Sequence, residues 1–349
     1  MSIHVQIASE NDKDRWNQFV DIECGSFFQY YDWKYIYENK KRNRYIPLLI
    51  QDSTDSILGI FPIVEQPGPI YPSLSSLPEG DSDGFLLNGN LNDNEKNLLV
   101  QSFLDFITSN YSQSHAFFSL RHQLSFSDES PQPSRRLIEN GYHWLDNSSK
   151  KLPCTYIMHL EKPFKEKIFR SMVKNLRNRI RHARKCGAQV ILDDNFTYFD
   201  VIAEMHREMV KEKFGLFNKK ENYDQVLKIF KNKLKLFVCL VDSEPVTALL
   251  NYYTPTTAYG AIGPYNQKAK AYLNNTLPMC ASIRYACEMG YQYFDLGITQ
   301  TTSLAVYKEK FGAKRIPMMI YQKKFSHFKM GANKAFSYMP GFARMDAMD

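Results

Sequence analysis

Residues 236–253, LFVCLVDSEPVTALLNYY, contain two apolar runs separated by a polar turn at residues 242–245. Residues 45–65, YIPLLIQDSTDSILGIFPIVE, repeat this arrangement, and an Asp-Ser pair stands in the turn of each segment. Apolar runs bounded by polar turn residues predict strands, so each segment is expected to form a strand–turn–strand unit. These two units lie in different halves of the chain and indicate an internal duplication.

The segments around the two hairpins predict alternating strands and helices. Each half continues after its hairpin with a helix, a strand, a short helix and a further strand. The chain has 349 residues, enough for two domains at roughly 100–200 residues each. We therefore expect an α/β (α+β) protein made of two domains of one kind, joined near Lys150.

Charge is distributed unevenly along the chain. The formal net charge is +7, yet residues 162–187 hold ten Lys or Arg and one Glu, and residues 308–334 hold eight and one. The remainder is therefore acidic. Two basic blocks on an acidic body predict a large anionic ligand.

The first basic block is expected to be one long helix over residues 164–186. Proline at 163 suits a first helical turn, and glycine at 187 suits a helix end. Apolar residues recur at intervals of three or four and form a single stripe: Phe164, Ile168, Met172, Leu176, Ile180 and Ala183.

Several classes of protein are disfavoured by composition. No run of 18 apolar residues is present, which argues against a membrane span, and the first residues do not resemble a secretory signal. Six cysteines without a CxxC pair are typical of reduced thiols in the cytoplasm. Eight histidines show no metal-ligand spacing, so no metal site is predicted.

Three segments, in the same order along the chain, resemble the FemAB/FemX-like transferases. Residues 176–187, LRNRIRHARKCG, are similar to the basic-helix pattern R-x-x-I-R-x-A-x-K-x-G of that family. Residues 293–297, YFDLG, followed by 304–313, LAVYKEKFGA, resemble its "YDFG … FKxxFG" ending. Residues 28–33, FQYYDW, resemble its "FxQSxxW" segment. The resemblance spans about residues 1–325.

This resemblance implies two tandem GNAT-like domains, each with a mixed, mostly antiparallel central sheet flanked by helices. The domains are expected at residues 1–150 and 151–325, the second beginning with the long basic helix, and residues 326–349 are expected to be a peripheral tail. The resemblance also implies amide-forming transfer of an acyl or aminoacyl group to an amine. Acyl-CoA or aminoacyl-tRNA would be the co-substrate, with no permanently bound cofactor.

The chain departs from the family pattern in two places. Residues 194–234 are too short for the helical-hairpin arm that the tRNA-using wall enzymes often carry. Residues 263–270, GPYNQKAK, carry lysines where CoA-binding GNAT enzymes have a glycine-rich phosphate loop. Both donors therefore remain open. The acceptor implied is anionic and amine-bearing, such as a UDP-sugar peptide or a lipid-linked precursor of peptidoglycan.

Lys308 is the catalytic candidate, because by resemblance it stands at the family's functional lysine. Acyl transfer to an amine requires stabilisation of a tetrahedral oxyanion, which a lysine near the reacting carbonyl can supply. The alternative is a surface lysine on a short amphipathic helix.

Arg177 and Arg181 are candidates for substrate binding. They are four residues apart and share one helix face, and two guanidinium groups there can bind a diphosphate. The alternative is a solvated basic face opposite the apolar stripe.

Four further residues are weaker substrate-binding candidates. Lys34 follows Trp33 on an expected helix at residues 30–38 and can reach an anionic substrate. Tyr259 and Asp295 lie near expected strand ends, with packing and loop capping as the respective alternatives. Gln300 belongs to a polar loop before the Lys308 helix.

Two classes of function follow from these observations. The first is a cytoplasmic GNAT-type N-acyltransferase, in which a lysine stabilises the oxyanion. The second is a non-catalytic nucleic-acid or polyanion-binding protein, with tRNA as a possible partner, in which the basic helix binds phosphates. Acyl transfer in the presence of donor and acceptor distinguishes them.

Overall fold

Both hairpins expected from the sequence are formed. One consists of β2 (Arg44–Asp52) and β3 (Ile57–Gln66), and the other of β10 (Leu234–Val241) and β11 (Glu244–Tyr253). In the second hairpin the turn is shorter than expected, because Asp242 and Ser243 both adopt positive φ angles. Two consecutive residues of this kind make the tight turn that suits the twist of paired strands.

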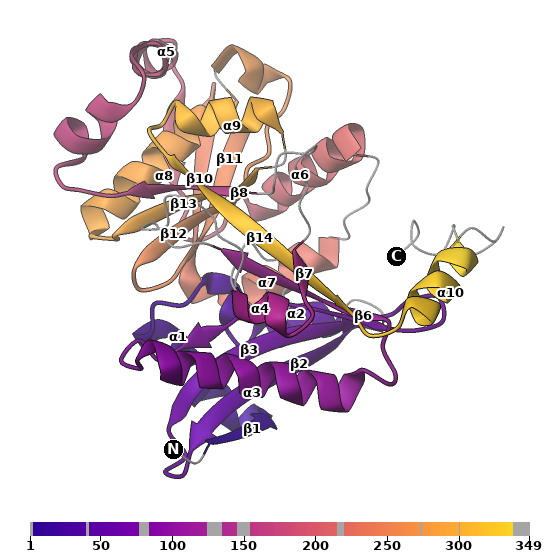
Figure 1. Cartoon of the computed structure of the whole chain (residues 1–349). Coiled ribbons are helices and arrows are strands. Elements are labelled where there is room, and N and C mark those ends of the chain that lie inside the picture. The colour runs from indigo at the N-terminus through magenta and orange to yellow at the C-terminus, as the bar shows by residue number, and fades with distance from the viewer. Residues whose placement is uncertain are drawn as a thin grey trace. The chain divides into compact units, whose positions relative to one another are not determined.

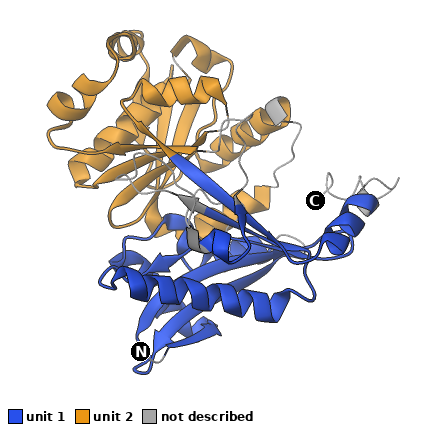
Figure 2. Ribbon diagram, in the orientation of Figure 1, with its two compact units in different colours: residues 1–153, 317–349 blue, residues 154–316 orange. Residues whose placement is uncertain are grey.

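The computed structural model describes residues 3–39, 42–76, 84–123, 135–144, 154–214, 220–272, 274–299 and 301–337. The chain divides into two units, shown in different colours in Figure 2. Unit 1 comprises residues 1–153 and 317–349, and unit 2 comprises residues 154–316.

Unit 1 is built on a sheet with the strand order β1-β2-β3-β4-β6-β14. Its remaining strands are β1 (Ile3–Ile7), β4 (Ser73–Ser75), β5 (Leu86–Leu87), β6 (Phe117–Gln123), β7 (His143–Trp144) and β14 (Lys314–Lys324). Its helices are α1 (Lys13–Ile22), α2 (Trp33–Glu38), α3 (Asp93–Tyr111), α4 (Arg135–Glu139) and α10 (His327–Ser337), with short 3-10 turns at Glu10–Asp12 and Phe27–Gln29.

Helix α3 covers one face of this sheet (Figure 1). Asn92 caps its first turn by accepting from the Glu95 amide at 3.0 Å, and the Glu95 carboxylate accepts from the Asn92 amide at 3.0 Å. This reciprocal capping satisfies two backbone donors that a helix otherwise leaves unpaired. Phe103 of α3 packs with Phe61 and Phe118 in the core of the unit.

Unit 2 is built on a sheet with the order β8-β13-β12-β11-β10-β9. Its remaining strands are β8 (Cys154–His159), β9 (Gln189–Leu192), β12 (Thr257–Ile262) and β13 (Tyr293–Thr299). Its helices are α5 (Lys174–Lys185), α6 (Phe199–Phe214), α7 (Lys220–Phe230), α8 (Thr276–Met289) and α9 (Thr302–Glu309), with a π turn η3 (Lys165–Phe169) and 3-10 turns at Lys231–Lys233 and Lys268–Tyr272. Apolar residues of η3, α5, α8 and α9 share one core with the sheet.

The two units repeat one topology. In each, an edge strand precedes a hairpin, and the next two strands are parallel and joined by a helix: β4, α3 and β6 in unit 1, and β12, α8 and β13 in unit 2. The other pairings within each unit are antiparallel. The expected fold class, two similar α/β domains with mostly antiparallel sheets, is confirmed.

The last strand of unit 1 departs from a simple tandem order. Strand β8 opens unit 2 and pairs with β13 of the same unit, as the expected boundary near Lys150 requires. Strand β14 follows β13 and α9, but residues 318–324 pair with β6 of unit 1. The boundary expected at residue 325 therefore differs from the observed division at residue 317. Seven consecutive residues of β14 pair with β6, which places them with unit 1.

The segment expected as one long helix is divided. The π turn Lys165–Phe169 and helix α5 are separated at residues 172–173, where Val173 is extended with ψ of 142°. The Val173 amide donates to the Lys310 carbonyl at 3.0 Å, so this backbone group bonds outside its own segment. The apolar stripe nevertheless faces the core, since Ile168, Met172 and Ile180 are buried.

Helix α10 occupies the first half of the expected C-terminal tail. The Asn333 side chain bonds the backbone of Ile70 and Tyr71, and the Lys329 ammonium donates to the carbonyl of Ser112 at 3.1 Å. Residues 338–349 lie outside the described part of the chain. Across that described part, no helix is long and apolar enough to span a membrane.

Candidate functional site

Lys308 lies near the end of α9, and only 5% of it is exposed. Its ammonium donates to the backbone carbonyls of Gly297 at 2.5 Å and Ile298 at 3.0 Å. Both carbonyls belong to the part of β13 where the register with β8 shifts, and Gly297 there has a φ of +81°. A buried ammonium requires such acceptors because it has lost its hydration. Lys308 therefore holds the irregular part of β13 in place.

Asp295 lies beside the same irregularity and is 2% exposed. Its Oδ1 accepts hydrogen bonds from the Thr155 hydroxyl and, at 2.8 Å, from the Gly297 amide. Burial raises the pKa of Asp295, while these two hydrogen bonds and the charge of Lys308 act in the opposite direction. The structure thus brings Asp295 and Lys308 together around Gly297.

Tyr259 is half-buried and stands opposite Asp295 at the last position where β12 and β13 pair. The parallel pairing ends there, although β12 continues to Ile262 and β13 to Thr299. Beyond this point β12 still pairs with β11, and β13 with β8, so the two strands diverge from each other. Their facing edges present backbone groups to a ligand that enters between them.

The start of α8 is the place to test for a CoA diphosphate, because backbone amides at a helix N-terminus bind such groups. Here Asn275 directs its side-chain amide to the Gly263 carbonyl instead of accepting a capping hydrogen bond. The first three helical residues, Thr276, Leu277 and Pro278, are buried, and proline has no N–H. A diphosphate bound by backbone amides does not fit at this helix end.

Arg177 and Arg181 have separate partners. The Arg177 guanidinium donates to the Arg170 carbonyl, which ties α5 to the segment before it. The Arg181 guanidinium lies over the Phe169 ring, 5.4 Å from its centroid, and donates to Asn178 at 3.1 Å. Their joint binding of one diphosphate stays a prediction.

A cleft of about 700 Å³ lies along α5 and α8 and the segment before α5. Arg181 is among the described residues that line it, and Arg177 is not. The basic residues of its lining are Lys162, Lys165, Arg170, Arg181, Arg184 and Arg284. Arg284 was not predicted from the sequence, because a single basic residue on an otherwise apolar helix carries no signal of its own.

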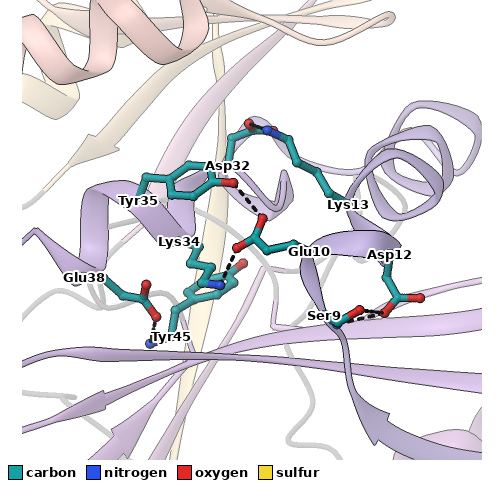
Figure 3. A network of polar contacts seen from close by, with 9 residues as sticks. All are labelled: Ser9, Glu10, Asp12, Lys13, Asp32, Lys34, Tyr35, Glu38 and Tyr45. Atoms are coloured by element: carbon teal, nitrogen blue, oxygen red, sulfur yellow. Dashed lines mark hydrogen bonds and ion pairs between the residues drawn. The ribbon is translucent and has the colours of Figure 1, made fainter.

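Lys34 belongs to a polar network in unit 1 that Figure 3 shows from close by. Its ammonium forms an ion pair with Glu10 at 2.5 Å, and the Tyr35 hydroxyl donates to the same carboxylate at 2.7 Å. Partial burial lowers the pKa of Lys34, but the hydrogen bond to Glu10 and the nearby Tyr31, Glu10 and Glu38 together raise this pKa above its usual value. Lys34 therefore has an acidic partner within its own unit.

Two remaining predictions concern Gln300 and metal binding. Gln300 lies outside the described residues, so its place stays a prediction. Among the residues that are described, no group of three or more His, Cys, Asp or Glu side chains is placed to hold a metal ion.

Comparison with known proteins adds a family to this geometry. Residues 170–309 match the family model described as an acetyltransferase (GNAT) domain. Unit 2 is therefore similar to a GNAT acetyltransferase domain over most of its length. The match covers α5, the diverging strands β12 and β13, α8 and α9. No curated protein matches the sequence.

Solved structures show that the whole chain has the tandem GNAT fold. The crystal structure of FemX has a TM-score of 0.71 and 13% identity, covering 97% of this chain and 99% of that one. A tandem GNAT protein from the clavulanic acid biosynthesis pathway has a TM-score of 0.56 and 8% identity, covering 93% and 99%. The C-terminal domain of a putative lysylphosphatidylglycerol synthetase from Agrobacterium fabrum has a TM-score of 0.59 and 12% identity. That match covers 96% of this chain and 98% of that one. The expected FemX-like tandem fold is confirmed, and the match of residues 170–309 to an acetyltransferase domain supports an acyltransferase.

Proposed function

We propose that this GNAT acyltransferase joins an acyl or aminoacyl group to the amine of an anionic acceptor, at the divergence of β12 and β13. The observation that carries the proposal is the end of strand pairing at Tyr259 and Asp295, directly beside the buried Lys308. An extended donor that contains amide groups can hydrogen-bond to the facing edges of the two strands, as an added strand would. Its reactive carbonyl is then held close to β13.

In this proposal Lys308 stabilises the tetrahedral oxyanion. The ammonium already donates to two carbonyls, so it must exchange one of them for the substrate oxygen. A preorganised cation in a site without water stabilises a developing oxyanion far more than the same cation does in solvent. Asp295 opposes the charge of Lys308 and keeps Gly297 in place by accepting from its amide.

The donor is proposed to be an activated acyl group, and acyl-CoA and aminoacyl-tRNA are the two forms to compare. Acyl-CoA is the typical co-substrate of the GNAT fold. The buried start of α8 argues that any CoA diphosphate contacts other groups than these amides. The six free cysteines support a cytoplasmic setting, where thiols stay reduced.

The acceptor is proposed to be an amine-bearing anion, such as a UDP-sugar peptide or a lipid-linked precursor of peptidoglycan. The exposed arginines and lysines of residues 162–187 support this choice. So do two of the similar structures, FemX and a protein named for lysylphosphatidylglycerol. Guanidinium groups recognise phosphate oxygens in two-point contacts that amines alone cannot offer.

The test is amide formation by the full chain, followed by mass spectrometry of the acceptor. Each donor, acetyl-CoA and aminoacyl-tRNA, is combined with a UDP-sugar peptide and with a simple primary amine. Lys308→Met, which keeps the apolar stem, is expected to lower turnover by at least 100-fold, in line with the loss of one oxyanion donor. Lys310→Ala is the control, because Lys310 is an exposed lysine two residues away.

Lys308→Met also removes two hydrogen bonds from this side chain to backbone carbonyls. Thermal unfolding of each variant therefore shows whether a loss of turnover comes from a loss of folded protein. A folded Lys308→Met variant with full turnover removes Lys308 from the reaction. Absence of amide product from every donor and acceptor pair contradicts the proposed transfer.

A second candidate function is polyanion binding without catalysis, and the cleft between α5 and α8 favours it. Gel-shift titration with RNA over a range of salt concentrations measures this binding. High affinity with a steep salt dependence, together with no acyl transfer, is the result that this alternative requires.

A further inference from the structure

Three side chains of unit 1, Ser114, His115 and Glu65, form a hydrogen-bonded series that the proposed reaction does not use. The Ser114 hydroxyl oxygen lies 2.8 Å from Nδ1 of His115, and Nε2 of His115 lies 3.0 Å from Oε2 of Glu65. A nucleophile bonded to a base, which a third group orients, is the arrangement that activates a serine. We propose that Ser114 is a nucleophilic site that takes an acyl group from an activated ester or thioester.

Glu65 determines the direction of these hydrogen bonds. An ionised carboxylate has only acceptors, so the proton of its contact with His115 must be carried by Nε2. In the neutral imidazole, Nδ1 then has no proton and accepts from the Ser114 hydroxyl. Arg44 contacts the same Glu65 oxygen at 3.2 Å, which fixes the carboxylate from a second side. His115 is therefore oriented to act as a general base toward Ser114.

The turn that carries Ser114, between α3 and β6, is held by several contacts. His115 is 4% exposed, and the Tyr111 ring meets its imidazole edge-on, with 5.1 Å between the ring centroids. The Ser114 and His115 amides both donate to the Tyr111 carbonyl, at 3.2 and 3.0 Å. The Lys329 ammonium of α10 donates to the His115 carbonyl and to two carbonyls before Ser114. The base is therefore fixed and buried, whereas Ser114 is exposed to solvent.

The backbone around Ser114 limits what this site can do. Because the Ser114 and His115 amides donate to Tyr111, and the Ala116 amide donates to the Pro72 carbonyl at 2.9 Å, none of the three is directed at an oxyanion. Loss of a single oxyanion donor lowers turnover by about 10²–10³-fold. Water is therefore expected to remove an acyl group from Ser114 slowly. The site is thus one of stoichiometric acylation, with one acyl group per chain.

The covalent step involves no oxidation or reduction. Oγ of Ser114 attacks the carbonyl carbon of the donor, and the hydroxyl proton passes to Nδ1 of His115. The bond from the carbonyl carbon to the sulfur or oxygen of the leaving group then breaks, and the leaving group takes the proton from the imidazolium. The product is a serine ester. Lys308 and Asp295 belong to unit 2 and take no part, so the step does not depend on the proposed amide formation.

The test is acetylation of the full chain, with p-nitrophenyl acetate and acetyl-CoA as separate donors. Intact-mass spectrometry counts the acetyl groups, and peptide mapping assigns them to residues. We expect one acetyl group on Ser114, formed in a single burst and lost slowly. Ser114→Ala is expected to abolish this labelling, and His115→Gln to lower its rate by about 100-fold or more, which is the ordinary contribution of a general base.

Ser112→Ala is the matched control, because Ser112 lies in the same turn. Among the described residues, the Ser112 hydroxyl has no hydrogen bond to a histidine. This variant is expected to be labelled at the wild-type rate. Thermal unfolding of each variant shows whether a loss of labelling comes from a loss of folded protein.

Three outcomes overturn the proposal. They are no acetyl group on Ser114 from either donor, equal labelling of Ser112 and Ser114, and an unchanged labelling rate in a folded His115→Gln variant. Labelling of Ser114 in a chain that forms no amide product supports this site and contradicts only the proposed function. Amide formation without labelling of Ser114 does the reverse.

Discussion

At the scale of single residues, the most unusual group is the pair of buried charges around Gly297. Asp295 accepts the Gly297 amide, and Lys308 donates to the Gly297 carbonyl. The amide and the carbonyl of this glycine, which has a positive φ, are thus each hydrogen-bonded to a charged side chain. Burying two charges is costly unless each has hydrogen-bond partners, and here each has them. Two buried charges at an irregular strand end are typical of a functional site.

Asp295 predicts a dependence of stability on pH. Burial raises the pKa of Asp295 in the folded state above its ordinary value, so the folded state binds this proton more tightly than the unfolded chain does. Stability therefore declines as pH rises from about 4 through the raised pKa. Asp295→Asn keeps an acceptor oxygen and removes this decline.

Urea unfolding of the wild type and Asp295→Asn between pH 4 and pH 7 measures the effect. The free energy of unfolding of the variant, relative to the wild type, is expected to grow as pH rises. Asp224→Asn, at an exposed position in α7, serves as the control. Parallel stability curves for Asp295→Asn and the wild type would show that burial of this carboxyl does not govern its titration.

At the scale of elements, helix α8 shows how one helix serves two purposes. Its first turn is buried and carries Pro278, so it supports the diverging strands without offering free amides. Its exposed side supplies Arg284 and Glu288 to the cationic cleft. It ends at Gly290, whose φ of +94° closes the helix in a left-handed conformation. Helix ends of this kind favour glycine because a side chain there is strained.

Two glycines at different helical positions give opposite predictions. Gly290→Ala is expected to lower the free energy of unfolding by about 1 kcal/mol, since alanine is strained at positive φ. Gly331→Ala, inside α10, is expected to raise it by about 0.5–1 kcal/mol, because an added methyl group meets nothing within 4 Å. Urea unfolding of both variants checks the signs, and equal effects would contradict the assignment of these two positions.

At the scale of the whole molecule, unit 1 completes its sheet with a strand that follows unit 2 in sequence. Met319 of β14 is fully buried in the core of unit 1, and Met158 of β8 is buried in the core of unit 2. Residues near position 319 therefore stabilise strands near position 50. This arrangement makes unit 1 depend on a distant part of the chain.

Hydrogen exchange read by mass spectrometry tests this dependence. Met319→Ala is expected to lower the free energy of unfolding by about 2–5 kcal/mol. It is also expected to lower amide protection in β2 and β3 more than in β10 and β11. Met158→Ala is expected to do the reverse. Loss of protection in β10 and β11 for Met319→Ala would mean that β14 supports unit 2, as the sequence alone had suggested.

The sequence by itself determined the local features of this protein. Apolar runs that alternate with turn residues predicted both hairpins, and glycine predicted the end of α8 at Gly290. The repeated order of elements predicted two similar domains. These follow from forces between residues that are close along the chain. The family resemblance gave Lys308 as a candidate, and positions along the chain gave Asp295 and Arg181 as separate candidates.

Only the tertiary structure decided which of these residues meet. Pairing between strands far apart in sequence assigned β8 and β14 to their sheets, ended the pairing of β12 and β13, and placed Asp295 beside Lys308. The Val173 amide donates a hydrogen bond to the Lys310 carbonyl, at the point where the expected long helix is divided. Folding also brought Arg184 of α5 and Arg284 of α8 to one cleft. Hydrogen bonds and burial between distant segments leave no periodic signal in the sequence, and only the folded chain reveals them.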